Sequence, residues 1–456
     1  MNLIMKHKLS DLAGSIALRD KFRTLVLASL PCTILSLFAQ VAPLPDEQQL
    51  PDRMHSAMSE LPSIRVGHAD ADFIGKDNRI LQAAVDYMAG LGGGTVEIGE
   101  GVYEMRDSLH VSSNIRIQGV PGKTILRKAK SYRSALALDG DFGEEQITLT
   151  DPTGFEIGYG VTVTDNRSGG FHTTVGRITG RRGNTFSISN PLMADCMVGE
   201  KAYAATIFPV ISIIHTSGVE IEGIVIDGNK DENLYLNGCR GAGIYMYRGH
   251  GTVLKDCMVK DYFGDGISFQ QSNDVSVLHC QSEGNSHLGL HPGSGSQRPV
   301  VSNNISKHNG EDGLFLCWRV RHGLFENNIL ENNGRFGISI GHKDSDNLLR
   351  GNHILFNEEA GVYFRNETFG MAGHRNRLEE NLIENNGVKS PAPGIRVRGE
   401  THGLVFRNNT IRDTRQGTDA LQTTGIRIEE SAGRVELDNN IIQAKQAVVD
   451  QRERKK

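Results

Sequence analysis

Side chains that can carry out acid–base chemistry gather in residues 227–367, where His, Arg, Lys, Asp and Glu occur close together. Lys343 and Arg365 stand out, because a lysine amine can remove a proton and a guanidinium can neutralise a carboxylate or protonate a leaving oxygen. On adjacent turns of a repeat the two would lie roughly 5 Å apart along the repeat axis. The pair predicts abstraction of the proton α to the carboxylate of an acidic sugar, with a nearby His as the alternative base.

Two aspartates offer a second chemistry. Asp265 and Asp312 each directly precede a Gly, so both occupy the same position of a repeat, two units apart. Two units correspond to about 9.6 Å, near the upper end of the roughly 6.5–9.5 Å typical of inverting glycosidases. His287 and His291 lie between them and are further catalytic candidates. The competing interpretation is that the two Asp only accept hydrogen bonds from turn amides and that both His are surface residues.

Aromatic and charged residues of the same stretch are candidates for substrate binding. Trp318 is the only Trp of the chain, and two arginines follow it closely. This arrangement predicts a platform on which a sugar ring stacks, with a guanidinium clamp for its carboxylate, and a solvated face is the alternative. The candidate binding residues are Tyr245, Trp318, Arg319, Arg321, His322, His342, Asp344, Tyr363 and Glu367.

The elements that position these residues form a repeat. From residue 243 onward a Gly followed by an aliphatic residue recurs about every 23–24 residues, with longer intervals after residues 361 and 394. Short runs such as GISF, GISI and GIRV alternate in polarity, which is the periodicity of strands. A repeat of this length without helical periodicity indicates a parallel β-solenoid, since the LxxLxL pattern of leucine-rich repeats is missing. We therefore expect an all-β solenoid with about 23–24 residues per coil.

A second column of residues accompanies the glycines. Asn tolerates left-handed turns, and stacked Asn side chains can satisfy one another's amide groups. We therefore interpret the column as structural and not as a binding site. Its members are Cys257, Cys280, Asn304, Asn328, Asn352, Asn381, Asn409 and Asn440.

The N-terminal half carries a recognisable succession of segments. Residues 78–89 place apolar residues at helical spacing, and GLGGGTVEIGEGVY (90–103) and a strand run at 114–120 follow. This succession resembles the start of the pectate-lyase-like superfamily, which includes rhamnogalacturonases and epimerases. The resemblance implies a right-handed parallel β-helix whose open end, otherwise an unpaired sheet edge, is covered by the helix. Residues 145–206 interrupt the repeat as a small antiparallel β insertion, either beside a substrate groove or without functional role.

Two segments are similar to carbohydrate-active groups of that superfamily. Residues 341–367 resemble the Lys and Arg coils of the chondroitinase B and alginate lyase group, which implies Lys343 as the base and Arg365 as the acid. The acidic calcium ligands of that group are replaced here by Phe336 and Ile338. GDGISF (264–269) and HLGLHPGS (287–294) resemble the Asp and GHG coils of polygalacturonases, without their NTD triplet and second Asp.

Composition excludes several classes of protein. The formal net charge of −5, from 49 Lys and Arg against 54 Asp and Glu, argues against a nucleic-acid binder. The apolar run at 24–39 after a basic flank predicts a signal peptide over 1–42, with a single membrane anchor as the alternative. The Cys lack CxxC spacing, which argues against a zinc site, and the five that follow residue 42 are an odd number, which argues against a complete disulfide framework; we expect buried thiols.

The expected organisation is a signal peptide (1–42), a linker (43–69), the right-handed parallel β-helix (70–445, with the insertion at 145–206) and a charged tail (446–456). The expected function is a secreted or cell-envelope protein that cleaves or modifies an acidic polysaccharide by β-elimination, with hydrolysis and C5-epimerisation as variants. A non-catalytic, glycan-binding or surface solenoid is the alternative. The chemistry requires no cofactor, while Ca²⁺ remains open; the expected partner is a polysaccharide, with no nucleic acid and no membrane apart from the leader.

Overall fold

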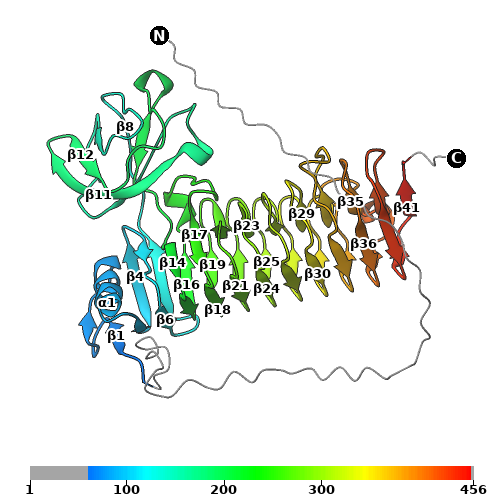
Figure 1. Ribbon diagram of the computed structural model, residues 1–456, viewed down its shortest axis with the longest axis horizontal. Helices are drawn as coiled ribbons and strands as arrows, with labels where there is room; N and C mark the ends of the chain where they lie inside the picture. The colour runs from blue at the N-terminus through cyan, green and yellow to red at the C-terminus, as the bar shows by residue number, and fades with distance from the viewer. Residues whose placement is uncertain (1–59, 453–456) are drawn as a thin grey trace, which may run out of the picture. The chain divides into compact units, whose positions relative to one another are not determined.

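The computed structural model describes residues 60–452 of the protein, and the predicted signal peptide lies outside this range. Three long sheets run through the molecule, and within each of them every neighbouring pair of strands is parallel (Figure 1). We call these sheets A, B and C, and their strands are given below. Each coil of the solenoid adds one strand to sheet C, then one to sheet A, then one to sheet B. The predicted all-β, right-handed parallel β-helix is confirmed.

The strands of each sheet follow one another along the helix axis. Sheet A contains β2 (Phe73–Ile74), β1 (Ser63–Gly67), β3 (Gly94–Ile98), β6 (Ile115–Gly119), β15 (Glu220–Glu222), β18 (Val253–Lys255), β21 (Ser276–Leu278), β24 (Val300–Ser302), β27 (Leu324–Glu326), β30 (Leu348–Arg350), β33 (Arg377–Glu379), β36 (Leu404–Arg407) and β39 (Val435–Asp438). Sheet B contains β4 (Gly101–Met105), β7 (Thr124–Lys128), β16 (Ile224–Asp227), β19 (Met258–Lys260), β22 (Gln281–Glu283), β25 (Ile305–Lys307), β28 (Ile329–Glu331), β31 (His353–Leu355), β34 (Leu382–Glu384), β37 (Thr410–Arg412) and β40 (Ile441–Gln443). Sheet C contains β5 (Leu109–His110), β14 (Ile211–Ser217), β17 (Ala242–His250), β20 (Asp265–Gln270), β23 (Leu290–Gly293), β26 (Leu314–Phe315), β29 (Ile338–Ile340), β32 (Val362–Phe364), β35 (Pro393–Val397), β38 (Thr424–Ile428) and β41 (Gln446–Asp450).

The strands of the solenoid extend further at both ends than the sequence predicted. Strand β1 lies inside the segment predicted as a linker, and β41 lies inside the segment predicted as a charged tail. Both pair in parallel with a neighbouring coil, β1 with β3 and β41 with β38. Each segment is too short to show the repeat by itself, and its strand forms because it extends a sheet that the neighbouring coils already build.

An antiparallel sheet of six strands interrupts the solenoid. Its order is β8-β13-β10-β11-β12-β9, and it encloses a small hydrophobic core of its own. The sheet already begins with β8, before the segment that the sequence singled out as an insertion. Its strands are β8 (Arg133–Ala135), β9 (Gln146–Thr148), β10 (Gly160–Thr164), β11 (Thr174–Arg182), β12 (Thr185–Ile188) and β13 (Tyr203–Ala205). Short 3-10 turns lie at Gly170–His172, Val198–Glu200, Lys230–Glu232 and Gly417–Asp419.

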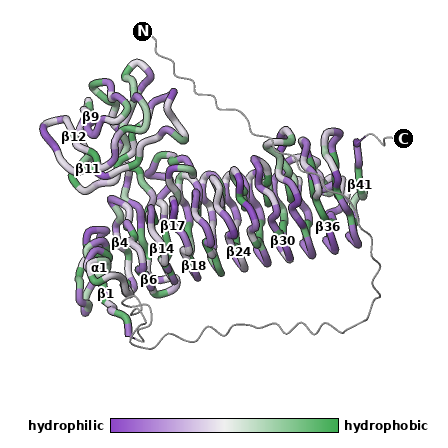
Figure 2. Tube along the Cα trace, in the orientation of Figure 1, coloured by the Kyte–Doolittle hydropathy of each residue, from purple (hydrophilic) through white to green (hydrophobic). Residues whose placement is uncertain are grey.

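The aliphatic residue after each repeat Gly forms the core of the solenoid. These residues pair in register along sheet C, and Ile244, Ile338 and Val362 are fully buried. The Gly before them is required where coils pack tightly, because a Cβ on Gly289 would lie 1.9 Å from Ser306 Oγ. Figure 2 shows the resulting alternation of hydrophobic and hydrophilic segments along the coils.

The predicted Asn column is a buried hydrogen-bonded ladder. The side-chain amide of Asn304 donates to Asn328 Oδ1 at 2.9 Å, and Asn328 donates to Asn352 Oδ1 at 2.9 Å. The same contact continues through Asn381 and Asn409 at 2.9 Å each. A second ladder that the sequence analysis missed runs through Asn285, Asn309, Asn333, Asn357, Asn386 and Gln422.

The ladder gives a first testable expectation for stability. Asn328→Ala leaves several buried amide and carbonyl groups without partners, so we expect it to lower the free energy of unfolding by at least about 2 kcal/mol. The neighbouring Asn327 has a left-handed backbone with φ 55°, so Asn327→Gly should change it by less than about 0.5 kcal/mol. Chemical denaturation of both variants measures the difference, and equal effects would contradict a structural role for the ladder.

Helix α1 (Asn78–Gly90) covers the N-terminal end of the core. The side chain of Asp77 caps it by accepting a hydrogen bond from the Arg79 backbone N–H. Leu81, Val85 and Met88 are fully buried against the first coils. Within residues 60–452 no helix is long and apolar enough to cross a membrane.

Candidate functional site

The outer face of sheet C brings most of the predicted site residues together. Its register pairs Ser268 with His291, and Phe315 with Ser339 and then Tyr363, so these side chains form one outward row. The rings of His291 and Phe315 lie 5.4 Å apart and connect the two halves of the row. Neighbouring coils are about 4.8 Å apart, so a chain-like ligand lying along the row would meet a new side chain at each coil.

Asp265 holds the two predicted histidines. Its carboxylate is fully buried, with Oδ1 2.8 Å from His287 Nδ1 and Oδ2 2.6 Å from His291 Nδ1. Burial opposes its charge, but the hydrogen bonds from both imidazoles outweigh burial and lower the pKa of Asp265. Burial likewise opposes the charge of each imidazole, yet Asp265 raises the pKa of His287 to about 10 and that of His291 to about 9. At neutral pH the pair is therefore cationic, and His287 is the member that keeps 29% side-chain exposure.

Two further acidic side chains, Glu311 and Asp312, lie close to His287 and Arg335. His287 Nε2 lies 3.3 Å from Glu311 Oε2, and Arg335 contacts both Glu311 and Asp312, at 3.0 and 3.3 Å. Asp312 is fully buried, which raises its pKa to about 6 although the Arg335 charge lowers it. Asp265 and Asp312 thus bind separate partners, and neither carboxylate is exposed to solvent. The sequence did not single out Glu311 or Arg335, because nothing in their local pattern distinguishes them from surface charges.

Arg365 is fixed against a third buried acid. Its guanidinium donates to Asp344 Oδ2 at 3.0 Å, to Ser339 Oγ at 2.9 Å and to the Leu316 carbonyl at 2.7 Å. It also lies over the Phe315 ring, 4.4 Å from its centroid, and only 10% of its side chain is exposed. Burial raises the pKa of Asp344 to about 7 even though Arg365 lowers it.

The turns that follow β26 and β29 are strained. Trp318, Arg319, His342 and Lys343 have φ of 65°, 69°, 46° and 69°, so two consecutive non-glycine residues are left-handed on each of two adjacent coils. Such conformations cost free energy and cluster at functional sites. The Trp318 and His342 rings lie 5.4 Å apart. The strain displays these side chains at the edge of the sheet C face.

Lys343 and His342 differ in their partners. His342 Nε2 lies 2.8 Å from Glu367 Oε1, so Glu367 orients the imidazole. Within residues 60–452 the Lys343 side chain makes no hydrogen bond or ion pair, although its backbone N–H donates to the Met371 carbonyl. The amine is therefore available to a ligand.

The remaining predicted binding residues have varied surroundings. Tyr245 is 4% exposed, and its hydroxyl donates to the Cys239 carbonyl at 2.8 Å. Tyr363 stacks on Phe336 with centroids 4.3 Å apart. Arg321 lies in the turn after Trp318, and its backbone forms isolated parallel β-bridges with the neighbouring coils. His322 beside it is exposed. Tyr245 and Tyr363 thus belong to the outward row of sheet C, while Arg321 and His322 lie in a turn beside it.

Several buried polar side-chain atoms on this face have no hydrogen-bond partner among the described residues. They include Gln270 Oε1, Asp312 Oδ2, His342 Nδ1 and Arg365 Nε. Buried polar groups without hydrogen-bond partners are rare in folded proteins, and each one needs a functional or structural explanation. Among the described residues, no group of three or more His, Cys, Asp or Glu side chains is placed to hold a metal ion.

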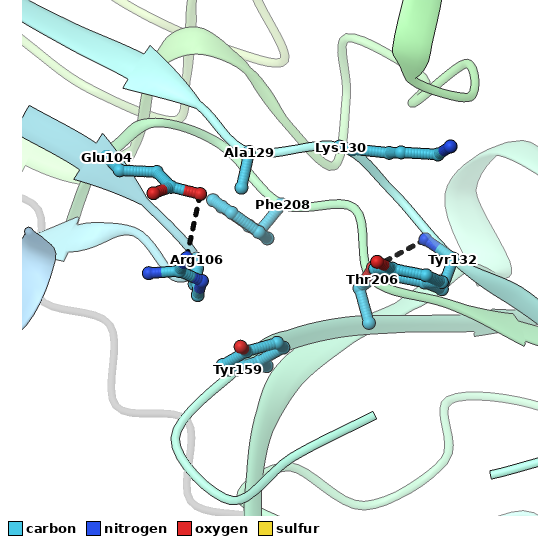
Figure 3. Close-up of a pocket in the computed structure, with 8 residues that line it drawn as sticks. All are labelled: Glu104, Arg106, Ala129, Lys130, Tyr132, Tyr159, Thr206 and Phe208. Atoms are coloured by element: carbon cyan, nitrogen blue, oxygen red, sulfur yellow. Dashed lines mark hydrogen bonds and ion pairs between the residues drawn. The ribbon is translucent and has the colours of Figure 1, made fainter. Parts of the chain in front are cut away.

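A small pocket on another part of the solenoid is a weaker candidate. It measures about 160 Å³ and is lined by Glu104 of β4, by the segment that follows β7 and by residues in and beside the insertion, including Lys130, Tyr132 and Tyr159 (Figure 3). Glu104 and Arg106 form an ion pair within it, at 2.9 Å. This volume is below the roughly 300–1,000 Å³ of typical ligand pockets.

Comparisons with known proteins agree with this architecture. A family model described as "Periplasmic copper-binding protein (NosD)" matches residues 220–420. The A-module of mannuronan C-5 epimerase AlgE4 from Azotobacter vinelandii is similar in structure, with a TM-score of 0.54, 15% identity, and coverage of 85% of this chain and 100% of that chain. The AlgE6 A-module from the same organism has a TM-score of 0.53 and 14% identity, and the match covers 83% of this chain and 93% of that chain. The Dettilon tailspike protein (gp208) has a TM-score of 0.53 and 11% identity, and the match covers 83% of this chain and 62% of that chain.

Comparison with curated protein sequences gives no match. At identities of 11–15% the structural likeness establishes the fold. The family-model match covers the coils that carry Asp265, His291 and Lys343. Together with the three parallel sheets, these likenesses show that the chain has the parallel β-helix fold.

Proposed function

We propose that the protein is an extracytoplasmic enzyme that removes the C5 proton of a uronate residue in an acidic polysaccharide and cleaves the chain by β-elimination. The observation that carries the proposal is the amine of Lys343, which has no partner among residues 60–452 and lies on a strained turn beside Trp318 and His342, one coil before Arg365. The predicted signal peptide and the periplasmic description of the matched family model support the location.

The cationic groups of the face fit the first requirement of this chemistry. A C5 proton becomes acidic enough to remove only when the neighbouring carboxylate is neutralised. Arg365 and the imidazolium of His287 supply positive charge on coils of the same face, and each is held by a buried carboxylate. Because those carboxylates are already in place, the charges need little rearrangement when the anionic sugar binds.

Lys343 then takes the C5 proton. The electron pair of the C5–H bond forms the C4–C5 double bond, the C4–O bond breaks, and the leaving oxygen takes up a proton. In its protonated form His342, oriented by Glu367 and beside Trp318, donates the proton that the leaving oxygen takes up, while Lys343 keeps the proton from C5. In this scheme the charge of Arg365 neutralises the carboxylate, and the hydrogen bonds to three protein oxygens fix the position of its guanidinium, whose side chain is 10% exposed.

C5-epimerisation is the second candidate, because two epimerase A-modules share the fold. Both reactions begin with removal of the C5 proton and differ in whether the intermediate loses its C4 substituent or is reprotonated on the opposite face. Hydrolysis through Asp265 and Asp312 is less favoured, because both carboxylates are fully buried. A non-catalytic solenoid does not account for the free Lys343 amine on its strained turn.

A copper centre is not supported by the described residues. The matched family model carries a copper-binding description, and copper sites combine His, Cys or Met ligands around one position. In the part of the chain from 60 to 452, no His, Cys, Asp and Glu side chains are grouped in this way. Calcium remains an open expectation that the assay below addresses.

The proposal is tested by incubating the protein with a panel of acidic polysaccharides, with and without Ca²⁺. Ultraviolet absorbance of the C4–C5 double bond and new reducing ends are followed together. β-Elimination predicts that both rise in parallel on at least one polymer. Reducing ends without absorbance would replace the proposal by hydrolysis, and a changed uronate composition without cleavage would replace it by epimerisation.

The acidic ligand should bind more tightly as the pH falls through about 7. Protonation of Asp344, whose pKa is raised to about 7, leaves the Arg365 charge without its counter-ion. His287 and His291 remain protonated in this range because their pKa values are about 10 and 9. We expect the Kd of an oligouronate to be about 5-fold lower at pH 6 than at pH 8, equivalent to ~1 kcal/mol.

Asp344→Asn is the matched variant for this pH dependence. It keeps the size of the side chain and removes the titrating group, so the pH step near 7 should disappear while the smaller effect of Asp312 near pH 6 remains. Calorimetric titration at several pH values measures both proteins. An unchanged step in Asp344→Asn would show that another group controls binding.

A further inference from the structure

A cavity of about 790 Å³ lies between the antiparallel insertion and the first coils of sheet C. Strand β11 supplies Val175 and Arg177 to one wall, while β14 and β17 supply Ile214, Tyr245 and Tyr247 to the other. This volume is within the roughly 300–1,000 Å³ of small-molecule sites. The insertion therefore adds a second wall to a face that is open elsewhere.

The cavity lining contains two arginines, Arg177 and Arg240, and two aspartates, Asp86 and Asp107. Arg240 donates to the Thr173 carbonyl at 3.0 Å and contacts Met193 Sδ, so neither of its partners is a carboxylate. Arg177 contacts Asp107, which is 2% exposed and also accepts a hydrogen bond from His110 at 3.1 Å. Asp86 and His215 are the other titratable groups at the rim. Asp107 is already shared by two partners, so among the described residues Arg240 is the arginine of the lining that has no carboxylate partner.

The cavity also offers stacking and hydrogen-bonding groups. Tyr247 is half-exposed and is held edge-on by His215, with centroids 5.4 Å apart. The hydroxyl oxygen of Thr216, which lines the cavity, is buried and has no partner among the described residues. An aromatic ring, an arginine and an unsatisfied hydroxyl together suit a ring with hydroxyl and carboxylate groups.

Strand register connects this cavity to the candidate site. Tyr245 pairs with Ser268, which pairs with His291, and Tyr247 pairs with Gln270, which pairs with Gly293. The cavity therefore lies two coils, or about 9.6 Å, from His291 along the same outward rows. A ligand that follows the rows of sheet C reaches the cavity without leaving the face.

We infer that the cavity between the insertion and β14 and β17 binds an acidic sugar residue of the same polysaccharide that the sheet C face acts on. The inference rests on the proposed function for the identity of the glycan and extends the binding site to the insertion. Arg240 pairs with the sugar carboxylate, and Tyr247 packs against the sugar ring. The insertion thus contributes to substrate binding and is not merely an interruption of the solenoid.

The test is calorimetric titration with a series of oligouronates of increasing length. The proteins are the wild type, Arg240→Gln, Tyr247→Ala and the control Arg182→Gln, whose arginine is exposed on the insertion and outside the cavity. We expect both cavity variants to bind long oligomers about 10-fold more weakly and the shortest ones unchanged, while Arg182→Gln binds as the wild type. Carboxyl-reduced oligomers should not distinguish Arg240→Gln from the wild type.

Trp318 separates this inference from the proposed reaction, since it is the only Trp and lies outside the cavity. Its fluorescence should still respond to saturating oligomer in both cavity variants, which shows that they fold and that the candidate site is intact. Wild-type affinity of both cavity variants at every length would overturn the inference, whether or not turnover occurs. Length-dependent loss of binding without any turnover would support the cavity and reject the proposed reaction.

Discussion

Lys343→Met is expected to lower the rate of β-elimination by about 10²–10⁴-fold, the usual contribution of a general base. Methionine keeps the length of the side chain but cannot take up the C5 proton. Since the Lys343 amine has no partner within residues 60–452, its loss should leave the thermal unfolding midpoint and oligouronate binding nearly unchanged. The measurement is the initial rate of unsaturated product formation at saturating substrate, with binding followed by Trp318 fluorescence.

The matched control is Lys389→Met, which removes a lysine that is 71% exposed and paired with Glu358. This variant should retain full activity and affinity. A Lys343→Met protein that folds, binds and turns over at more than about half the wild-type rate would remove Lys343 from the mechanism. The base would then have to be sought among the other residues of the sheet C face.

Asp265→Asn is expected to have the largest effect on stability. Breaking a buried ion pair by neutralising one partner costs about 3–5 kcal/mol, because the remaining charge stays buried. Here a single carboxylate holds two imidazoles, at 2.8 and 2.6 Å. Asp274→Asn is the control, because Asp274 pairs with Arg298 on the surface, both side chains being 55% exposed, and such pairs contribute about 0–1 kcal/mol.

The pH dependence of this effect follows from the pKa shifts. The raised pKa values of His287 and His291, about 10 and 9, contribute stability that is complete below about 6.5 and is lost as the pH rises through 9 to 10. The lowered pKa of Asp265 contributes stability that is lost only in acid. Chemical denaturation should therefore show the difference between wild type and Asp265→Asn shrinking above pH 9. A difference that is constant from pH 6 to 10 would contradict the charged triad.

The sequence predicted the solenoid well because its two columns report directly on packing. Gly289 is required where Ser306 of the next coil approaches, and Asn328 satisfies amides of both neighbouring coils. Each repeat imposes the same requirement again, so the pattern is visible without a structure. The second Asn ladder also follows the repeat, since Asn309 and Asn333 each lie four residues before a repeat Gly, but the sequence analysis aligned only one Asn column.

The candidate site was predicted in part. The position of Asp265 one coil before His291 was readable from the repeat, but the burial of Asp265 and Asp312 was not, since a residue before Gly can point either way. Glu311 and Arg335 join the site only because stacking brings adjacent coils together. The contacts of the insertion, such as Arg177 with Asp107, depend on its tertiary placement and leave no periodic signal.

The most direct test of the account uses an acidic polysaccharide labelled with deuterium at C5. Release of the label into water measures proton abstraction itself, whether the final product is unsaturated or epimerised. If Lys343 removes the C5 proton, the wild type releases the label and Lys343→Met releases it at least about 100-fold more slowly. Cleavage of the labelled polymer without any release of deuterium would contradict removal of the C5 proton.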